Sequence, residues 1–409
     1  MSFPFHLPLL LDGATATNLA AAGMPGGVCV EKWILENPEK LTKLQSDFIE
    51  AGAQAVYAPT FGANRACLSS YGLEAEVADI NQKLVALSQS VAKPAGVLVG
   101  GNVCPTGLFV PPFGESDFDD IYDIYREQIR ALDDAGVDFI AIETQTSLAD
   151  MRAAVLAART TNLPVFVTVT VDESGHTLTG GSLLPAVITL QAMGADAIGL
   201  NCSFGPEHML EHVEQVAPHI SVPIIAKPSA GVPMWNSPEH SGILSPDEFA
   251  ARMRGLMEAG ARIVGGCCGS TVEHLKALAQ VAKEFGPPEI PEEPDCYAAA
   301  NEREAFFLGD DIVFSEPIAC TSSLGEDLID LDDEQVTAAL VEVNSLDDAL
   351  LLSENSTMTR LPIAVYCDSL PVLDAALRYF QGRLIVDSAC PIETDLIEPL
   401  AAKYGAIVY

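Results

Sequence analysis

Basic side chains are scarce in this chain of 409 residues, which has 21 lysines and arginines against 57 aspartates and glutamates and a formal net charge of −36. Nucleic acids and anionic membranes are bound through basic surfaces, so neither is an expected partner. Apolar runs of the roughly eighteen residues that a membrane-spanning helix needs are also missing. The N-terminal MSFPFHLPLLLDG has no basic residue before its apolar run, unlike a secretory signal. We therefore predict a cytoplasmic protein.

Cysteine is sparse as well, with ten residues in the whole chain. This number is too low for a disulfide scaffold, and without an export signal we expect reduced thiols. Hydrophobic residues make up 49% of the chain and charged residues 19%, which excludes an intrinsically disordered protein. The length suits one large domain and one small one.

A proline-rich stretch, GPPEIPEEPDC, divides the chain near residue 290. Proline removes backbone donors and disfavours helix, so this stretch is typical of a linker. The part that follows is the more acidic, with 25 acidic and 5 basic side chains in residues 289–409. We predict a domain over 1–288, a linker over 289–304 and a second domain over 305–409.

The first part repeats one pattern, in which a helical segment ends in glycine and a short β-rich run follows, as in EAGAQAVYAPT and DAGVDFIAIET. Glycine suits the left-handed residue that closes a helix, and the buried run suits a parallel strand. Eight such β/α units favour a (β/α)8 TIM barrel over the alternative, an open doubly wound sheet. The expected strands are 7–12, 53–59, 96–102, 137–142, 164–170, 195–200, 222–227 and 261–266.

Three cysteines follow two of these strands, Cys202 in GLNCS and the adjacent Cys267 and Cys268 in GGCCGS. Active sites of such barrels lie where the strands end. Thiolates are strong zinc ligands, and three protein ligands leave a fourth tetrahedral position open for a substrate. The alternative is that all three are buried structural thiols, the usual fate of a free cysteine.

These motifs resemble those of the homocysteine S-methyltransferase family, including the N-terminal homocysteine module of cobalamin-dependent methionine synthase. The resemblance covers residues 9–285 and rests on phrases that occur in the family's order: LLDGATAT (10–17), PTFGAN (59–64), IET (142–144), GLNCS (199–203), KPSAGVP (227–233) and GGCCGS (265–270). It implies that Cys202, Cys267 and Cys268 bind Zn²⁺ and carry the catalysis, with the homocysteine thiol in the open position.

The resemblance also implies how homocysteine is held. Asp12 and Glu143 match acidic residues that meet the substrate ammonium, although Asp12 before Gly13 could equally be a turn residue. Backbone amides near Thr60, Phe61 and Gly62 are expected to receive the substrate carboxylate. Asn201 is expected to lie at the substrate site and orient Cys202.

The tail contains further strand-like runs at 361–369, 383–388 and 406–409, separated by helical segments. It resembles part of the methyltetrahydrofolate-binding barrel of cobalamin-dependent methionine synthase, so we predict a reduced, pterin-binding-like α/β domain. The alternative is a small appendage that packs on the barrel or mediates assembly.

We therefore predict an enzyme that transfers a methyl group to the thiol of homocysteine with zinc as cofactor, forming methionine. The resemblance of the tail favours methylcobalamin on a separate corrinoid protein as the donor. The alternatives are betaine, S-methylmethionine or another donor, a different thiol acceptor, or a non-catalytic thiol or metal sensor.

Overall fold

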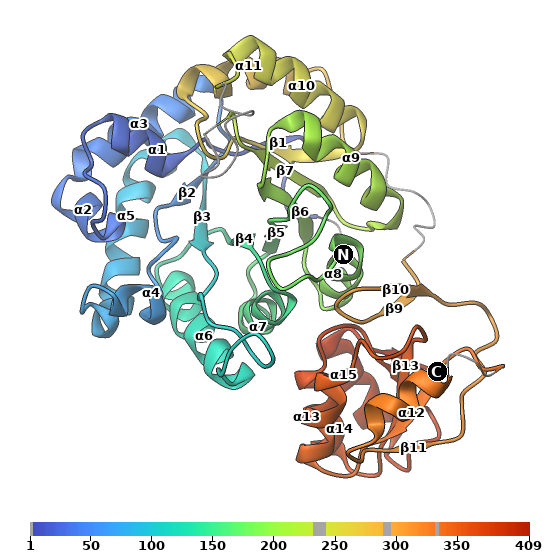
Figure 1. Cartoon of the computed structure of the whole chain (residues 1–409). Helices are drawn as coiled ribbons and strands as arrows, with labels where there is room; N and C mark the ends of the chain where they lie inside the picture. Colours follow the sequence, from blue (N-terminus) through green and yellow to red (C-terminus); the bar gives the residue numbers. More distant parts are fainter. Residues whose placement is uncertain (1–2, 232–242, 289–295, 332–334) are drawn as a thin grey trace.

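The computed structural model describes residues 3–231, 243–288, 296–331 and 335–409, and its first part is a ring of parallel strands inside a ring of helices (Figure 1). The eight strands are hydrogen-bonded in the order β1-β8-β7-β6-β5-β4-β3-β2. The amide of Gln54 donates to the carbonyl of Leu10 at 2.8 Å, which links the two ends of this order. The predicted (β/α)8 barrel is therefore confirmed.

Each observed strand lies within or close to its predicted range, displaced or shortened by a few residues. The strands are β1 (Leu9–Leu10), β2 (Ala55–Ala58), β3 (Leu98–Val103), β4 (Phe139–Gln145), β5 (Val165–Val169), β6 (Ala197–Cys202), β7 (Ile224–Pro228) and β8 (Ala261–Val264). The repeated glycine pattern forms the helix–strand turns as expected, because Gly52, Gly136, Gly194 and Gly260 all have φ between 74° and 118°.

Helices cover the outside of the barrel between successive strands (Figure 1). They are α1 (Thr15–Ala21), α2 (Val30–Glu36), α3 (Pro38–Ala51), α4 (Arg65–Ser69), α5 (Val77–Ala95), α6 (Phe118–Asp134), α7 (Leu148–Ala158), α8 (Leu183–Ala192), α9 (Pro206–Val216), α10 (Pro246–Glu258) and α11 (Val272–Ala282). Among the described residues, no helix combines the length and apolarity that crossing a bilayer requires.

Aromatic rings fill the end of the barrel where the strands begin. Phe139 and Phe166, the first or second residues of β4 and β5, stack with ring centroids 4.5 Å apart. Phe3 and Phe5, which precede β1, pack on these rings at 5.7 and 5.8 Å. This aromatic plug closes one end of the barrel, so a ligand site has room at the opposite end, where the strands finish.

A smaller unit follows the barrel and contains a five-stranded parallel sheet in the order β11-β12-β13-β14-β15. Three of its strands match the predicted runs of the tail; β11 and β12 were not predicted. The strands are β11 (Ile318–Ala319), β12 (Ala339–Glu342), β13 (Ile363–Tyr366), β14 (Ile385–Val386) and β15 (Ile407–Val408). The helices are α12 (Leu324–Asp330), α13 (Leu346–Glu354), α14 (Leu370–Tyr379) and α15 (Thr394–Tyr404).

An antiparallel pair, β9 (Ala298–Ala300) and β10 (Ala305–Phe307), lies between the two units (Figure 1). β9 falls inside the predicted linker 289–304, of which residues 289–295 lie outside the described residues. Ala298 and Ala300 are buried in one cluster with Ile188 of α8. The described end of the linker is thus a strand that packs on the barrel, while the domain boundaries themselves stay a prediction.

A buried arginine joins the barrel to the smaller unit. Arg152 of α7 is fully buried and donates to the carbonyls of Leu377 and Arg378, at 2.7 and 3.0 Å, at the end of α14. Asp119 of α6 forms an ion pair with Arg378 and accepts a hydrogen bond of 3.1 Å from Tyr379. These contacts attach the smaller unit to the outer face of the barrel.

Candidate active site

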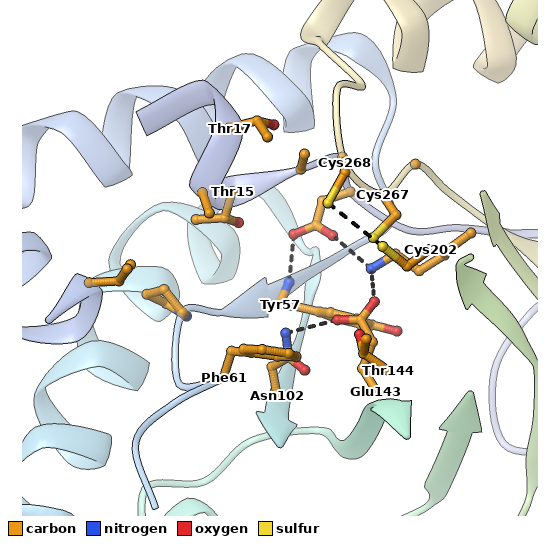
Figure 2. Close-up of a pocket in the computed structure, with 18 of the residues that line it drawn as sticks. Thr15, Thr17, Tyr57, Phe61, Asn102, Glu143, Thr144, Cys202, Cys267 and Cys268 are labelled. Carbon is orange, nitrogen blue, oxygen red and sulfur yellow. Dashed lines mark hydrogen bonds and ion pairs between the residues drawn. The ribbon is translucent and has the colours of Figure 1, made fainter. Parts of the chain in front are cut away.

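The three predicted cysteine ligands meet at the open end of the barrel (Figure 2). Cys202 ends β6, and Cys267 and Cys268 follow β8; their sulfur atoms all lie within 4.8 Å of one another. The Sγ atoms of Cys202 and Cys268 are 3.7 Å apart. Two sulfurs bound tetrahedrally to zinc at about 2.3 Å lie roughly 3.8 Å from each other, so the separation of this pair suits a zinc ion.

Local backbone geometry brings these thiols together. Cys202 and Ser203 have positive φ values of 59° and 45°, which turn the chain sharply at the end of β6. After β8, a Cβ atom at Gly266 would lie 2.3 Å from the hydroxyl of Ser270, which itself donates to the carbonyl of Cys267 at 2.7 Å. The glycine therefore allows the tight turn that presents both neighbouring cysteines.

The thiols are protonated when no cation is bound. The hydrogen bond with Cys202, together with burial, raises the pKa of Cys267 to about 12. A cation bound by these three sulfurs at neutral pH would therefore displace their protons, which is the usual coupling between metal binding and proton release.

The side chain of Asn201 contacts both the thiol cluster and the end of β4. Its Nδ2 atom lies 3.8 Å from the sulfur of Cys267 and 2.8 Å from the hydroxyl of Thr144, while its Oδ1 accepts from the amide of Thr144 at 2.9 Å. Thr144 has a φ of 62°, a conformation that costs energy in a threonine. Asn201 thus joins the end of β4 to Cys267. The sequence analysis had expected it to orient Cys202.

The two predicted carboxylates lie side by side beneath the thiols, and a lysine lies between them. Lys227 of β7 is buried and places its Nζ 2.7 Å from Oε1 of Glu143 and 3.8 Å from Oδ1 of Asp12. Its ammonium also lies 3.9 Å from the ring centroid of Tyr57. Asp12 and Glu143 therefore already share one cation that belongs to the protein.

Burial and charge act in opposite directions on these groups. Burial raises the pKa of Asp12 to about 6, against the attraction of Lys227. Burial lowers the pKa of Lys227, but the charge of Glu143 and the neighbouring groups outweighs this and holds it above its ordinary value. Lys227 thus carries its charge at neutral pH.

A cavity of about 380 Å³ opens above this ion pair, and the thiol cluster forms part of its wall. Asp12, Glu143 and Phe61, three of the residues predicted to bind the substrate, line it too. Phe61 is 38% exposed. The cavity thus brings three sulfurs, two carboxylates and an aromatic ring to a space of ligand size.

Three other predicted substrate contacts lie outside the cavity lining. They are Thr60, Gly62 and Asn201. The amide of Gly62 donates to the carboxylate of Glu31 at 2.8 Å, and the amide of Thr60 donates to the carbonyl of Ala58 at 2.7 Å. Both amides thus have acceptors within the protein, and their contact with a substrate carboxylate stays a prediction.

Lys227 and Asn102 are among the residues of the site that were not predicted as substrate contacts. Lys227 begins the phrase KPSAGVP, and Asn102 is the last residue of the third expected strand, 96–102. The Nδ2 of Asn102 donates to Glu143 at 3.0 Å (Figure 2), while its buried Oδ1 has no hydrogen-bond partner among the residues that the structure describes. A lysine inside a buried parallel strand was the signal for Lys227, because a charge there needs a partner.

Comparison with known proteins identifies the family of the chain. A profile described as homocysteine S-methyltransferase matches residues 9–282. The chain is 30% identical to a methionine synthase of Mycobacterium tuberculosis and 29% identical to that of Mycobacterium leprae, in each case over 97% of this chain and 37% of the relative. It therefore spans little more than a third of the length of these relatives.

Solved structures of the homocysteine methyltransferase MmuM from Escherichia coli are similar to the barrel. The metallated form has a TM-score of 0.57 and 26% identity over 66% of this chain and 95% of MmuM. The apo form has a TM-score of 0.54 over 67% of this chain. With the thiol cluster at the mouth of a (β/α)8 barrel and the profile matching most of the chain, the protein belongs to the homocysteine S-methyltransferase family.

Proposed function

We propose that this chain transfers a methyl group to the thiol of homocysteine, forming methionine, with Zn²⁺ held by Cys202, Cys267 and Cys268. The observation that carries this proposal is the thiol cluster, whose sulfurs lie within 4.8 Å of one another in the wall of a cavity. Three protein ligands leave one zinc position for the thiol of the substrate. When bound, zinc supplies positive charge that favours the thiolate, the nucleophilic form.

The residues of the chain bind and orient the acceptor. Asp12 and Glu143 supply negative charge for the ammonium of homocysteine, and the free Oδ1 of Asn102 supplies a further acceptor beside Glu143. Phe61 supplies an apolar surface to the same cavity. A nucleophile held in line with a methyl group gains most of its rate from such positioning.

Methylcobalamin on a separate corrinoid protein is the proposed donor. Similarity to methionine synthases extends over 97% of the chain and so includes the smaller unit, whereas MmuM aligns with 66% of it. The smaller unit is thus shared with methionine synthases, and its resemblance to their pterin-binding region favours a cobalamin-linked route. We also propose that the protein acts in the cytoplasm.

A donor panel tests the function. The zinc-loaded protein is incubated with homocysteine and, separately, methylcobalamin, betaine, S-methylmethionine or methyltetrahydrofolate, and methionine is measured. Of these four donors, we expect only methylcobalamin to yield methionine. Turnover with betaine or S-methylmethionine, and none with methylcobalamin, would show that methylcobalamin is not the donor. A protein that binds no stoichiometric zinc and forms no methionine with any donor would instead match a thiol sensor.

A further inference from the structure

Two cysteines outside the thiol cluster lie side by side near the end of β3. The sulfur of Cys67, in α4, is 3.6 Å from the sulfur of Cys104, which directly follows β3. The sulfurs of a disulfide are about 2.05 Å apart, so these two would have to approach each other by about 1.5 Å. Rotation about the Cα–Cβ bonds moves sulfur atoms over such distances. We call these two residues the thiol pair.

The environments of the two thiols differ. Cys67 is half-buried, whereas Cys104 is 4% exposed. The hydrogen bond with Cys104 lowers the pKa of Cys67 to about 7, against the effect of burial. The same hydrogen bond, together with burial, raises the pKa of Cys104 well above its ordinary value. Cys67 is therefore the accessible and partly ionised thiol, and Cys104 is the enclosed and protonated one.

This division of properties suits oxidation in two steps. The thiolate is the form of cysteine that attacks an oxidant, and attack requires access from solvent. A second thiol within contact distance can then convert the oxidised sulfur into a disulfide before it is oxidised further. Cys67 has the properties that the first step needs, and Cys104 is placed for the second.

Hydrogen bonds connect the thiol pair to the segment that carries Phe61. The Oδ1 of Asn64 accepts from the amide of Cys67 at 2.9 Å, and its Nδ2 donates to the sulfur of Cys104 at 3.4 Å. The amide of Cys104 donates to the carbonyl of Phe61 at 3.1 Å. Phe61 lines the cavity, so a covalent bond between the two sulfurs would act on a wall of the candidate active site.

We propose that the thiol pair is a reversible oxidation site, at which a hydroperoxide converts Cys67 and Cys104 into a disulfide. The inference uses no residue of the thiol cluster and does not depend on the proposed methyl transfer. It adds to this chain a point at which the oxidation state of the surroundings acts on the segment beside the cavity.

The reaction balances as follows from the two thiols. The Cys67 thiolate attacks one oxygen of the hydroperoxide, so that an S–O bond forms, the O–O bond breaks and the released oxygen takes up a proton. The sulfur of Cys104 then attacks the sulfenic acid of Cys67, and its proton leaves with the hydroxyl group as water. Two thiols and one hydroperoxide thus give one disulfide, one water and one alcohol, or a second water from hydrogen peroxide. A small dithiol restores both thiols by thiol–disulfide exchange.

Peptide mapping of the full-length protein tests the site. The reduced protein is treated with hydrogen peroxide, its remaining thiols are alkylated under denaturing conditions, and it is digested with trypsin. The thiol pair then lies on two peptides, 66–83 and 84–126, with one cysteine each, because Lys93 precedes a proline and resists cleavage. We expect a disulfide between these two peptides in most chains, and its loss after treatment with dithiothreitol.

Three variants separate the two steps. In Cys104→Ala, which lacks the second thiol, we expect Cys67 to stop at the sulfenic acid, which dimedone traps. In Cys67→Ala, Cys104 should stay reduced because it is buried and protonated. Cys320→Ser changes a half-buried cysteine of the smaller unit and should give the same joined peptides as the wild type.

Amide hydrogen exchange tests the connection to the cavity. We expect oxidation to change the exchange rates in residues 61–64 by about threefold or more in the wild type. The same treatment of Cys67→Ala should leave these rates unchanged. Equal rates in the oxidised and reduced wild type would overturn the connection to the cavity.

Two outcomes of the mapping would overturn the oxidation site itself. One is that Cys67 and Cys104 are both alkylated after the peroxide treatment of the wild type. The other is that a disulfide joins either of them to a different cysteine. Methyl transfer can still be found in both cases, because none of these measurements uses turnover.

Discussion

The ammonium of Lys227 lies 2.7 Å from the carboxylate of Glu143, although 84 residues separate them in the chain. The contact joins β7 to β4 across the barrel mouth, and both side chains are buried. Neither charge could be buried alone without a large desolvation cost. The ion pair therefore holds Glu143 in one orientation before any ligand arrives.

Replacing Glu143 by glutamine removes the charge that is expected to meet the substrate ammonium. We expect Glu143→Gln to weaken homocysteine binding by about 1.5–3 kcal/mol, the value of a charge-assisted hydrogen bond. Its zinc content should stay at the wild-type level, because the thiol cluster is untouched. Steady-state kinetics and elemental analysis measure the two effects. Glu214→Gln, on the exposed side of α9, is the control, and an unchanged KM in Glu143→Gln would contradict the assignment.

Zinc stoichiometry tests the thiol cluster directly. We expect about one Zn²⁺ per chain in the wild type, and much less after dialysis against a weak chelator in each of Cys202→Ser, Cys267→Ser and Cys268→Ser, since serine is a poor zinc ligand. Cys67→Ser, which changes a cysteine outside the cluster, should retain the metal. Full retention of zinc in Cys268→Ser would remove that residue from the ligand set.

The close packing of β6 against β7 predicts that Gly199 cannot be replaced by a larger residue without a loss of stability. A Cβ atom at Gly199 would lie 1.8 Å from the carbonyl oxygen of Ile225, so the two strands must separate to admit it. We expect Gly199→Ala to lower the free energy of unfolding by about 3 kcal/mol or more. At Gly286 an added Cβ meets nothing within 4 Å, and Gly286→Ala should be nearly neutral. Equal stability of the two variants in denaturant titration would show that the strands can adjust.

A buried carboxylate gives the stability a pH dependence. Burial raises the pKa of Asp150 to about 6, although Thr106 donates to both its oxygens. Since the folded-state pKa exceeds the unfolded value of about 3.9, folding binds a proton, and stability falls as pH rises between these two values. From pH 5 to pH 8 the expected loss is about 1.4 kcal/mol. Denaturant titrations should show that Asp150→Asn lacks this pH-dependent loss of stability. The same pH profile of stability in the wild type and in Asp150→Asn would refute the prediction.

The buried arginine between the two units predicts a further stability effect. Arg152→Met keeps the aliphatic bulk but leaves the carbonyls of Leu377 and Arg378 without their donor. We expect a loss of about 2–3 kcal/mol in the free energy of unfolding. Arg159→Met, which changes the exposed residue that follows the same helix, should change it by less than about 0.5 kcal/mol. A second, separate melting transition in calorimetry would show that the smaller unit then unfolds by itself.

The barrel could be predicted from sequence because its signals are local. A helix end at Gly52 or Gly136 and the apolar run after it fall within about ten residues of each other. The strand β11 lies in EPIACTSS, where the apolar run is short and is flanked by proline and polar residues, so it offers no such signal. The Lys227–Glu143 pair was missed because the sequence carries no sign of which charges meet across a barrel, so the carboxylates were assigned to the substrate alone.

The aromatic plug formed by Phe3, Phe5, Phe139 and Phe166 has a kinetic consequence. Because that end of the barrel is filled, homocysteine and the methyl donor must both enter the cavity from the end where the strands finish. The thiol of homocysteine goes to the thiol cluster, deeper in the cavity than the donor, so homocysteine has to bind first. The methylated product can leave only after the demethylated donor has dissociated. A reaction in this cavity should therefore follow a compulsory order, with the donor second in and first out.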